Sequence, residues 1–199
     1  MEHMKKVFKY ISILILIGII LSGCTRTAPG NDETPAPEPV EENRVLVAYF
    51  SITGNTAKVA EEIYALTEGD IYEIVPLYPY EEEDLQYYVE CRSTVEQSDP
   101  TIRPEIGSPD LDMSSYSVIF IGYPIWYGEE PRILDTFVEK YDFEGKTVIP
   151  FCTSDNSPIG DSGKNLESNA GSGSWLEGMR FPADFSKEDV EDFVREVMK

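Results

Sequence analysis

Residues 51–56, with the sequence SITGNT, carry side chains whose types and spacing suit the binding of an anion. Ser51, Thr53 and Thr56 supply hydroxyl groups that can donate hydrogen bonds. Gly54 permits backbone conformations closed to other residues, and Asn55 tolerates a left-handed conformation, so the loop can wrap an anion with its N–H groups. A helix that begins directly after it would add unpaired N–H groups and the positive end of its dipole. The stretch therefore predicts a phosphate-binding loop.

The loop contains no lysine, which limits the kind of phosphate that it can hold. A nucleoside triphosphate loop would read G-x-x-x-x-G-K-[ST], and a dinucleotide loop would read G-x-G-x-x-G, whereas Gly54 stands alone. Neutral donors favour a single phosphate monoester over a polyphosphate with its metal. The alternative is a polar turn that only connects a strand to a helix.

A second stretch, with the sequence PIWYG, follows the apolar run at residues 117–123. Proline and glycine prevent the strand from continuing, so two large aromatic side chains stand on a loop at the carboxyl end of a strand. Open α/β sheets bind their ligands at this edge. The pattern predicts a surface for a flat ring, although a tryptophan here could instead cap the core. The residues concerned are Pro124, Ile125, Trp126, Tyr127 and Gly128.

A long polar loop follows the apolar run at residues 147–153 and is the expected third wall of the same site. Parallel strands end at one edge of a sheet, so this loop should approach the other two. Its candidate binding residues are Thr153, Ser154, Asp155 and Gly160.

These three loops resemble those of the flavodoxin-like proteins of the short-chain type, which bind flavin mononucleotide (FMN). The first loop, at residues 51–56, fits the phosphate loop pattern [ST]-x-T-G-[NT]-T. The second, at residues 124–128, resembles the P-x-W-x-G loop that packs against the isoalloxazine ring. The third departs from the commoner T-S-G-G-S-G pattern, because Asp155, Asn156 and Pro158 replace flexible positions. The resemblance covers residues 44–199.

The resemblance implies a non-covalent FMN protein that takes and gives electrons through its flavin, without a catalytic residue of its own. The residues at 51 and 53–56 would hold the phosphate, and Trp126 or Tyr127 would stack on the ring. The backbone around them would face the N5 edge of the ring. Carboxylates at Asp155 and Asp161 would lower the reduction potential if they approach the ring, because they disfavour the anionic reduced flavin.

The elements that must position these loops alternate between strands and helices. The segment at residues 81–97 is expected to be helical and very acidic, with Tyr87 and Tyr88 as packing residues, and residues 99–113 are expected to form a loop. The alternation predicts an α/β fold, a three-layer α/β/α sandwich whose five-stranded parallel sheet has the flavodoxin-like order 2-1-3-4-5. Strands are expected at 44–50, 70–76, 117–123, 147–153 and 174–181, and helices from the first loop to Gly69, from Pro131, over 164–170 and from an N-cap at Ser186.

The first 43 residues predict export and attachment to a membrane. Residues 1–23 combine three lysines, a short apolar run and the sequence Leu-Ser-Gly before Cys24, which is typical of a signal peptide rather than a spanning helix. The sequence LSGC resembles a bacterial lipobox, which implies a lipid on Cys24 and a domain outside the cytoplasmic membrane. Residues 24–43, rich in proline and acidic residues, would be a disordered, semi-extended tether to a domain at 44–199. The alternative is an uncleaved anchor.

The predicted domain is strongly acidic, and its charge limits the classes of molecule that it can bind. Residues 44–199 hold 12 Lys and Arg against 31 Asp and Glu, a net charge of 12 − 31 = −19. This charge argues against nucleic acid as a partner and favours a cationic patch on a partner protein, unless it only keeps the protein soluble.

The residue types that remain after removal of the signal peptide exclude several kinds of catalytic site. Only His3 is a histidine, and its loss excludes a Ser-His-Asp triad, a Cys-His pair and a histidine-ligated metal. Cys91 and Cys152 remain, too few for a four-cysteine zinc site, and whether they pair is open.

Three functions fit these expectations. The domain could transfer electrons to a redox partner protein, it could reduce quinones or similar small acceptors, or it could be a flavin-binding or interaction module without turnover. Electron transfer is favoured because no dinucleotide fingerprint offers a site for a nicotinamide donor.

Overall fold

The computed structural model describes residues 44–199. The predicted signal peptide at residues 1–23, the lipidation site at Cys24 and the tether at residues 24–43 lie outside the described residues. Within residues 44–199, no helix is long and apolar enough to cross a bilayer. The same part of the chain holds no group of three or more His, Cys, Asp or Glu side chains that could bind a metal ion.

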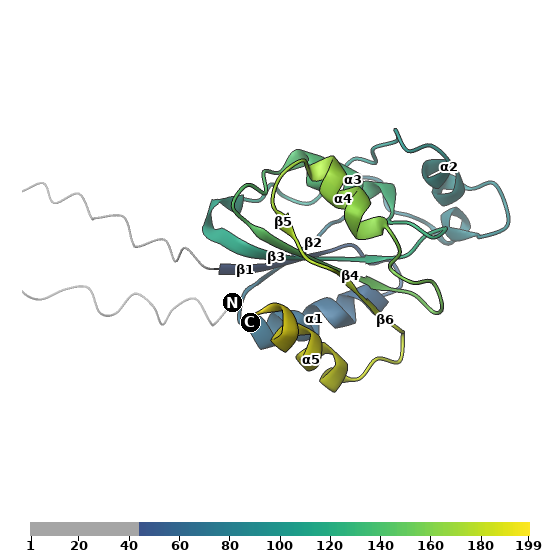
Figure 1. The fold of residues 1–199 in the computed structure, drawn as a ribbon. Coiled ribbons are helices and arrows are strands. Elements are labelled where there is room, and N and C mark those ends of the chain that lie inside the picture. Colours follow the sequence, from purple (N-terminus) through teal and green to yellow (C-terminus); the bar gives the residue numbers. More distant parts are fainter. Residues whose placement is uncertain (1–43) are drawn as a thin grey trace, which may run out of the picture. The chain divides into compact units, whose positions relative to one another are not determined.

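A parallel sheet forms the middle layer of the domain (Figure 1). Its order, β2-β1-β3-β4-β5, confirms the predicted order 2-1-3-4-5, and β6 pairs with β4 beyond the end of β5. Val47, Phe120 and Ile149 stand side by side across the three central strands. The strands are β1 (Arg44–Tyr49), β2 (Asp70–Glu73), β3 (Tyr116–Pro124), β4 (Thr147–Thr153), β5 (Ser174–Trp175) and β6 (Met179–Phe181).

Helices cover both faces of this sheet, which confirms the three-layer sandwich. Figure 1 shows two helices on one face, α1 (Asn55–Thr67) and α5 (Lys187–Val197), and two on the other, α3 (Arg132–Lys140) and α4 (Ser162–Ala170). The predicted cap at Ser186 is confirmed, because its hydroxyl accepts a hydrogen bond from the N–H of Asp189 at 3.2 Å.

Alternation along the central strands produces two separate cores. In β1, Leu46 and Ala48 point toward the α3–α4 face, while Val47 and Tyr49 point toward the α1–α5 face. A strand buried on both faces must be apolar at nearly every position, and this explains the continuous run that begins at Val45. The layers therefore hold the ends of the central strands rigidly.

Three expected elements differ in the structure. The second strand ends at Glu73 rather than at Pro76, and Pro76 forms only an isolated antiparallel bridge to Ile106. The expected helical segment at 81–97 consists of a 3₁₀ helix, η1 (Glu82–Leu85), a non-helical stretch and a short helix, α2 (Arg92–Ser98). The expected fifth strand is split into β5 and β6, because residues 176–178 leave the ladder between them.

The direction of the strands separates the two edges of the sheet. Arg44 begins β1 at one edge, and the loops after β1, β3 and β4 leave from the other, the carboxyl edge (Figure 1). The helices run back from the carboxyl edge, so Val197, at the end of α5, returns to the edge where β1 begins. At the same edge, Gly69 connects α1 to β2. Only glycine fits there, because a Cβ would lie 2.4 Å from the carbonyl oxygen of Val45.

Candidate functional site

The three predicted loops meet at a cleft on the carboxyl edge of the sheet. The cleft has two adjoining cavities of about 160 Å³ and about 680 Å³, which share Thr53, Tyr87, Pro124 and Trp126. The larger cavity has the size of a typical small-molecule site. Most of the predicted binding residues line the cleft: Ser51, Thr53, Asn55, Thr56, Pro124, Ile125, Trp126, Tyr127, Thr153, Ser154 and Asp155.

The first loop turns at Gly54, which adopts a left-handed conformation with φ of 84°. Gly54 occupies the N-cap position of α1, and no side chain caps that end of the helix. The N–H groups of the first turn of α1 thus have no side-chain acceptor and remain available to a bound anion. Gly54 itself shapes the loop without lining either cavity.

A buried hydrogen bond joins the first loop to the third. The hydroxyl oxygens of Thr56 and Thr153 lie 2.7 Å apart, and both side chains are buried. This bond holds the start of α1 against the end of β4, so the two loops keep a constant separation.

Charge is scarce along the walls of the cleft. Asp155 is the one charged residue that lines either cavity, as far as residues 44–199 are concerned. Arg180, on β6, lies behind the third loop and donates hydrogen bonds from Nη1 to the carbonyl oxygens of Ser154 at 2.8 Å and Asp155 at 3.1 Å. The cleft therefore offers mainly hydroxyl and amide groups, with a guanidinium group behind one wall.

The second loop is a tight turn after β3. The N–H of Trp126 donates to the carbonyl of Glu129 at 2.9 Å, and the N–H of Glu129 donates back at 3.0 Å. Tyr127 and Gly128, between them, both have positive φ, of 52° and 90°. Two positive φ values in succession are typical of a type I′ turn, which suits glycine well and tyrosine poorly. The turn places Tyr127, 38% exposed, along the smaller cavity.

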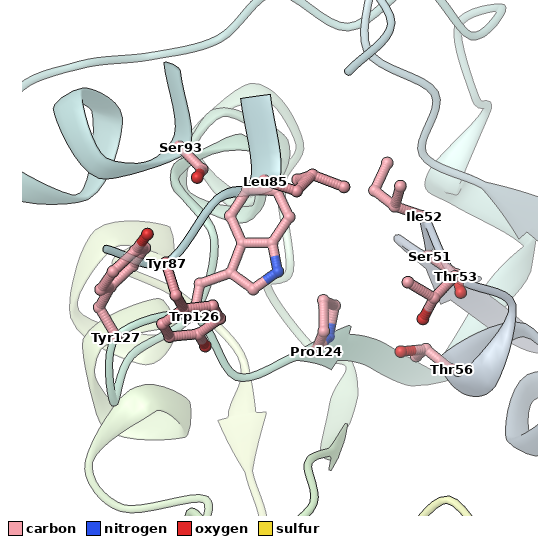
Figure 2. Close-up of a pocket in the computed structure, with 10 residues that line it drawn as sticks. All are labelled: Ser51, Ile52, Thr53, Thr56, Leu85, Tyr87, Ser93, Pro124, Trp126 and Tyr127. Carbon is pink, nitrogen blue, oxygen red and sulfur yellow. The ribbon is translucent and has the colours of Figure 1, made fainter. Parts of the chain in front are cut away.

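Trp126 packs in the core and also lines both cavities of the cleft. Its side chain is 9% exposed, and its ring packs edge-on against Phe50 at 5.4 Å and Tyr80 at 5.2 Å between centroids. Figure 2 shows its indole between the first-loop residues and the Tyr87–Tyr127 pair. No hydrogen-bond partner of the indole N–H is found within residues 44–199. The two interpretations of Trp126, core cap and cleft wall, therefore both hold.

The third loop lines the cleft only in its first part. Ser154 and Asp155 face the larger cavity, together with Asn156 and Ser157. Gly160 lies instead beside a separate groove next to α4, and Asp161 forms an ion pair with Lys164 at 2.9 Å, outside the cleft. Gly160 thus lines neither cavity of the cleft, although a Cβ there would lie 4.0 Å from the carbonyl oxygen of Gly128 in the second loop. Of the two carboxylates, only Asp155 lines the cleft. The cause is the start of α4 at Ser162, which carries the chain away.

Comparison with known proteins agrees with this geometry. Residues 44–197 match the sequence profile of the flavodoxin family. The chain belongs to this family. A provisionally named flavoprotein from Bacteroides uniformis is 40% identical, with 77% of this chain and 98% of that chain covered and a TM-score of 0.73. A provisionally named flavoprotein from Bacteroides eggerthii is also 40% identical, with 78% and 98% covered and a TM-score of 0.73.

A more distant likeness concerns the fold alone. A flavoprotein from Lactobacillus acidophilus, solved in complex with FMN, is 21% identical, with 75% of this chain and 97% of that chain covered and a TM-score of 0.56. No protein of curated function matches the chain significantly.

This flavodoxin-family protein adds a fourth element to the cleft, a strap formed by residues 78–98 between β2 and β3. Leu85, Tyr87 and Ser93 of the strap line the smaller cavity, and Tyr87 and Tyr88 line the larger one. The interpretation of the two tyrosines as packing residues is wrong, because Tyr87 is 53% and Tyr88 99% exposed. The signal in the sequence was the pair of adjacent tyrosines in an acidic stretch that lacks a helical apolar stripe.

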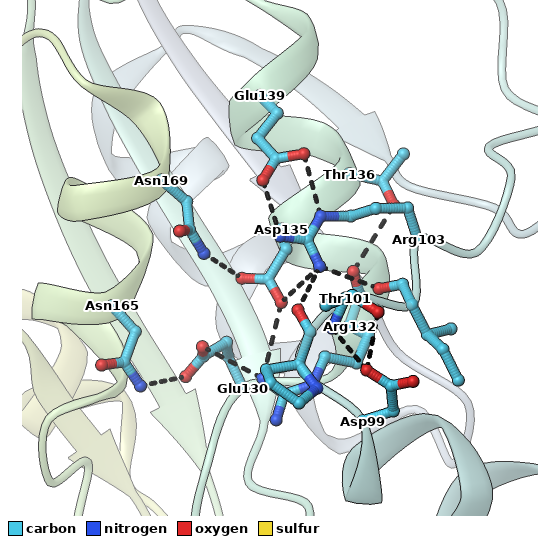
Figure 3. Close-up of polar contacts among 12 residues, drawn as sticks. Asp99, Thr101, Arg103, Glu130, Arg132, Asp135, Thr136, Glu139, Asn165 and Asn169 are labelled. Carbon is cyan, nitrogen blue, oxygen red and sulfur yellow. Dashed lines mark hydrogen bonds and ion pairs between the residues drawn. The ribbon is translucent and has the colours of Figure 1, made fainter.

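A buried polar cluster lies behind the second loop, between α3 and α4 (Figure 3). Glu130 follows the turn directly and is buried, and burial raises the pKa of its carboxyl to about 7. Asn165 of α4 donates to its Oε2 at 3.3 Å, while Arg132 Nη1 lies 3.7 Å from its Oε1. Arg132 in turn approaches Asp135 at 3.5 Å. The cluster fixes the second loop to the two helices.

The two cysteines are free and lie in different environments. Cys152 is buried on β4, and burial raises the pKa of its thiol to about 12. Cys91 lies at the start of α2, where hydrogen bonds, chiefly with Ser93, lower the pKa of its thiol. Neither residue lines the cleft.

Proposed function

We propose that this flavodoxin-family protein binds FMN non-covalently in the cleft and transfers electrons through the bound flavin. The observation that carries the proposal is the convergence of the first loop, Trp126 and the third loop on one cavity of about 680 Å³. Membership of the flavodoxin family and the FMN complex of the Lactobacillus acidophilus protein, which shares the fold, support it.

The first loop fits a phosphate monoester. The uncapped start of α1 offers N–H groups, and Ser51, Thr53 and Thr56 place hydroxyl groups along the same wall. Neither cavity is lined by lysine or arginine from residues 44–199, so the donors to the phosphate would be neutral. Arg180 adds a positive charge behind the third loop.

The second and third loops fit a flat, partly polar ring. Trp126 offers an apolar wall and a free indole N–H, and the backbone of the Tyr127–Gly128 turn lies beside it. Bound FMN would supply the redox chemistry. The protein would hold the ring, exclude water from its inner face and, through Asp155, disfavour negative charge on it.

An absorbance spectrum of residues 44–199, taken after addition of FMN and passage through a desalting column, tests the proposal. Flavin bands that stay with the protein are the expected result. A colourless protein would refute FMN binding and leave an interaction module as the function of the cleft.

The acidity of the domain supports a protein as its electron partner, and we propose one with a cationic docking surface. Electron transfer should then slow steeply as salt concentration rises. Rapid oxidation of NAD(P)H by the loaded protein in the presence of a quinone would instead favour a reductase of small acceptors.

The N-terminal sequence supports a further proposal, that Cys24 carries a lipid which anchors the protein outside the cytoplasmic membrane. Expression of the full chain in a bacterial host and separation of the membranes tests this. The native protein should sediment with the membranes, and a Cys24→Ala variant should keep its uncleaved N-terminus. Equal processing of both would refute the lipid anchor.

A further inference from the structure

The walls of the cleft offer aromatic side chains from only two elements, in the part of the chain that the structure describes. Trp126 comes from the second loop, and Tyr87 and Tyr88 come from the strap. The third loop offers small and polar groups alone, through Thr153 to Ser157, and Ala183 stands beside it. A flat ring that rests on Trp126 finds no aromatic cover from the third loop. Tyr127 lines only the smaller cavity, so the other aromatic groups that the described residues place along the larger cavity belong to the strap.

The strap is firmly attached at both ends of its tyrosine pair. Before the pair, the Tyr80 ring packs against Phe50 at 6.0 Å and Trp126 at 5.2 Å between centroids. Arg92, after the pair, joins the two ends of the strap, because its guanidinium lies 3.9 Å from the centre of the Tyr80 ring and donates to the carbonyl of Tyr78 at 2.7 Å. The hydroxyl of Tyr80 donates to Glu96, which also pairs with Arg92 at 2.7 Å. Also after the pair, Gln97 donates from Nε2 to the carbonyl of Glu130 at 3.0 Å, which attaches this end to the second loop.

The tyrosine pair itself is held weakly. Residues 86–91 belong to no helix or strand. The Tyr87 hydroxyl reaches only the carbonyl of Ile125, at 3.5 Å, and its ring lies 4.7 Å from that of Tyr127. Tyr88, at 99% exposure, packs against almost nothing. An exposed tyrosine beside a cavity gains the free energy of apolar burial as soon as a ring enters that cavity.

We propose that Tyr88, supported by Tyr87, is the outer cover of the flavin ring, carried by the strap rather than by the third loop. This inference rests on the proposed binding of FMN. Trp126, locked by Phe50 and Tyr80, is the fixed inner wall, and Tyr88 is the movable outer one. The strap ends keep the pair at the mouth of the cleft, so closing needs only a rearrangement within residues 86–91.

The test compares Tyr88→Ala with Tyr78→Ala. Tyr78 lies on the same strap and is 65% exposed, but it lines neither cavity. Titration of the FMN-free proteins with FMN, followed by flavin fluorescence, should show an affinity loss of about ten-fold or more for Tyr88→Ala, the scale of one aromatic stacking contact. Tyr78→Ala should bind as the native protein does, and Tyr88→Phe should keep most of the affinity.

Nitration of the native protein with tetranitromethane gives a second measurement that needs no variant. Without FMN, Tyr78 and Tyr88 should both react because both are exposed. With FMN, Tyr88 should be protected and Tyr78 should react as before, as read by peptide mass spectrometry.

The outcomes separate the two proposals. A native protein that retains FMN while Tyr88 reacts equally in both states, with unchanged affinity in Tyr88→Ala, would overturn the outer cover and leave FMN binding intact. A native protein that binds no FMN would overturn both.

Discussion

Replacement of Glu130 by glutamine is expected to change how the stability of the domain depends on pH. Glu130 is 1% exposed, and its Oε1 has no hydrogen-bond partner within the described residues. Burial is the main cause that raises its pKa from 4.5 to about 7, and the charge of Asp135 adds to it. Asn165 and Arg132 act in the opposite direction without cancelling the effect.

The sign and size of the effect follow from these two pKa values. Because the pKa is higher in the folded state, the folded protein binds the proton more tightly than the unfolded chain does. The stability gained in this way is fully present below about pH 4.5 and is lost as the pH rises through about 7. The gap between the two values corresponds to about 3 kcal/mol, of which roughly 2–3 kcal/mol is lost between about pH 5 and about pH 8.

Urea unfolding of the FMN-free native domain and of Glu130→Gln, at about pH 5 and about pH 8, measures this loss. Glutamine keeps the oxygen that accepts from Asn165 but cannot ionise. The variant should therefore gain roughly 2–3 kcal/mol relative to the native domain at the higher pH. Glu144 is exposed, so in the control variant Glu144→Gln the free energy of unfolding should change with pH as it does in the native domain. If the unfolding free energies of Glu130→Gln and of the native domain changed equally between about pH 5 and about pH 8, the reasoning would be refuted. Such a result would mean that Glu130 is ionised in the folded state over this whole pH range.

The remaining predictions concern the cleft and the two thiols. Thr56→Val or Thr153→Val alone leaves a buried hydroxyl without its partner and should cost about 1–3 kcal/mol in unfolding free energy. The double variant should cost less than the sum of the two, as a double-mutant cycle will measure. Trp126→Ala should lower the unfolding free energy of the FMN-free domain by about 3–5 kcal/mol because it empties core space, whereas a loss below about 1 kcal/mol would contradict its packing role. In the native domain at about pH 8, Cys91 should react with a thiol reagent and Cys152 should not, while urea should expose both.

The elements that depend on local pattern could be predicted from the sequence. Three such features are the apolar run from Val45, the glycine at position 54 and the helix cap at Ser186. Each indicates a local backbone conformation that depends on residues close by in the sequence. The loops that follow parallel strands must meet at one edge, so the convergence of the three loops followed from the strand order. Pattern and topology together were sufficient for the inner half of the cleft.

The strap could not be predicted, because its course depends on contacts distant in sequence. Arg92 on the Tyr80 ring and Gln97 on the carbonyl of Glu130 decide where Tyr87 and Tyr88 lie, and no periodicity records such contacts. The same holds for Arg180, whose hydrogen bonds to the third loop span 25 residues or more. The burial of Glu130 could not be predicted for another reason, because glutamate residues are more often exposed than buried.

The direction of the chain has a practical consequence. Arg44 and Val197 both lie at the edge of the sheet opposite the cleft (Figure 1). An affinity tag, a fused second domain or a linker to an electrode, joined at either of these ends, would therefore leave the mouth of the cleft uncovered. Immobilised in this way, the domain would present the cleft to the solution with a uniform orientation, and every molecule on the surface would be equally accessible to a soluble partner.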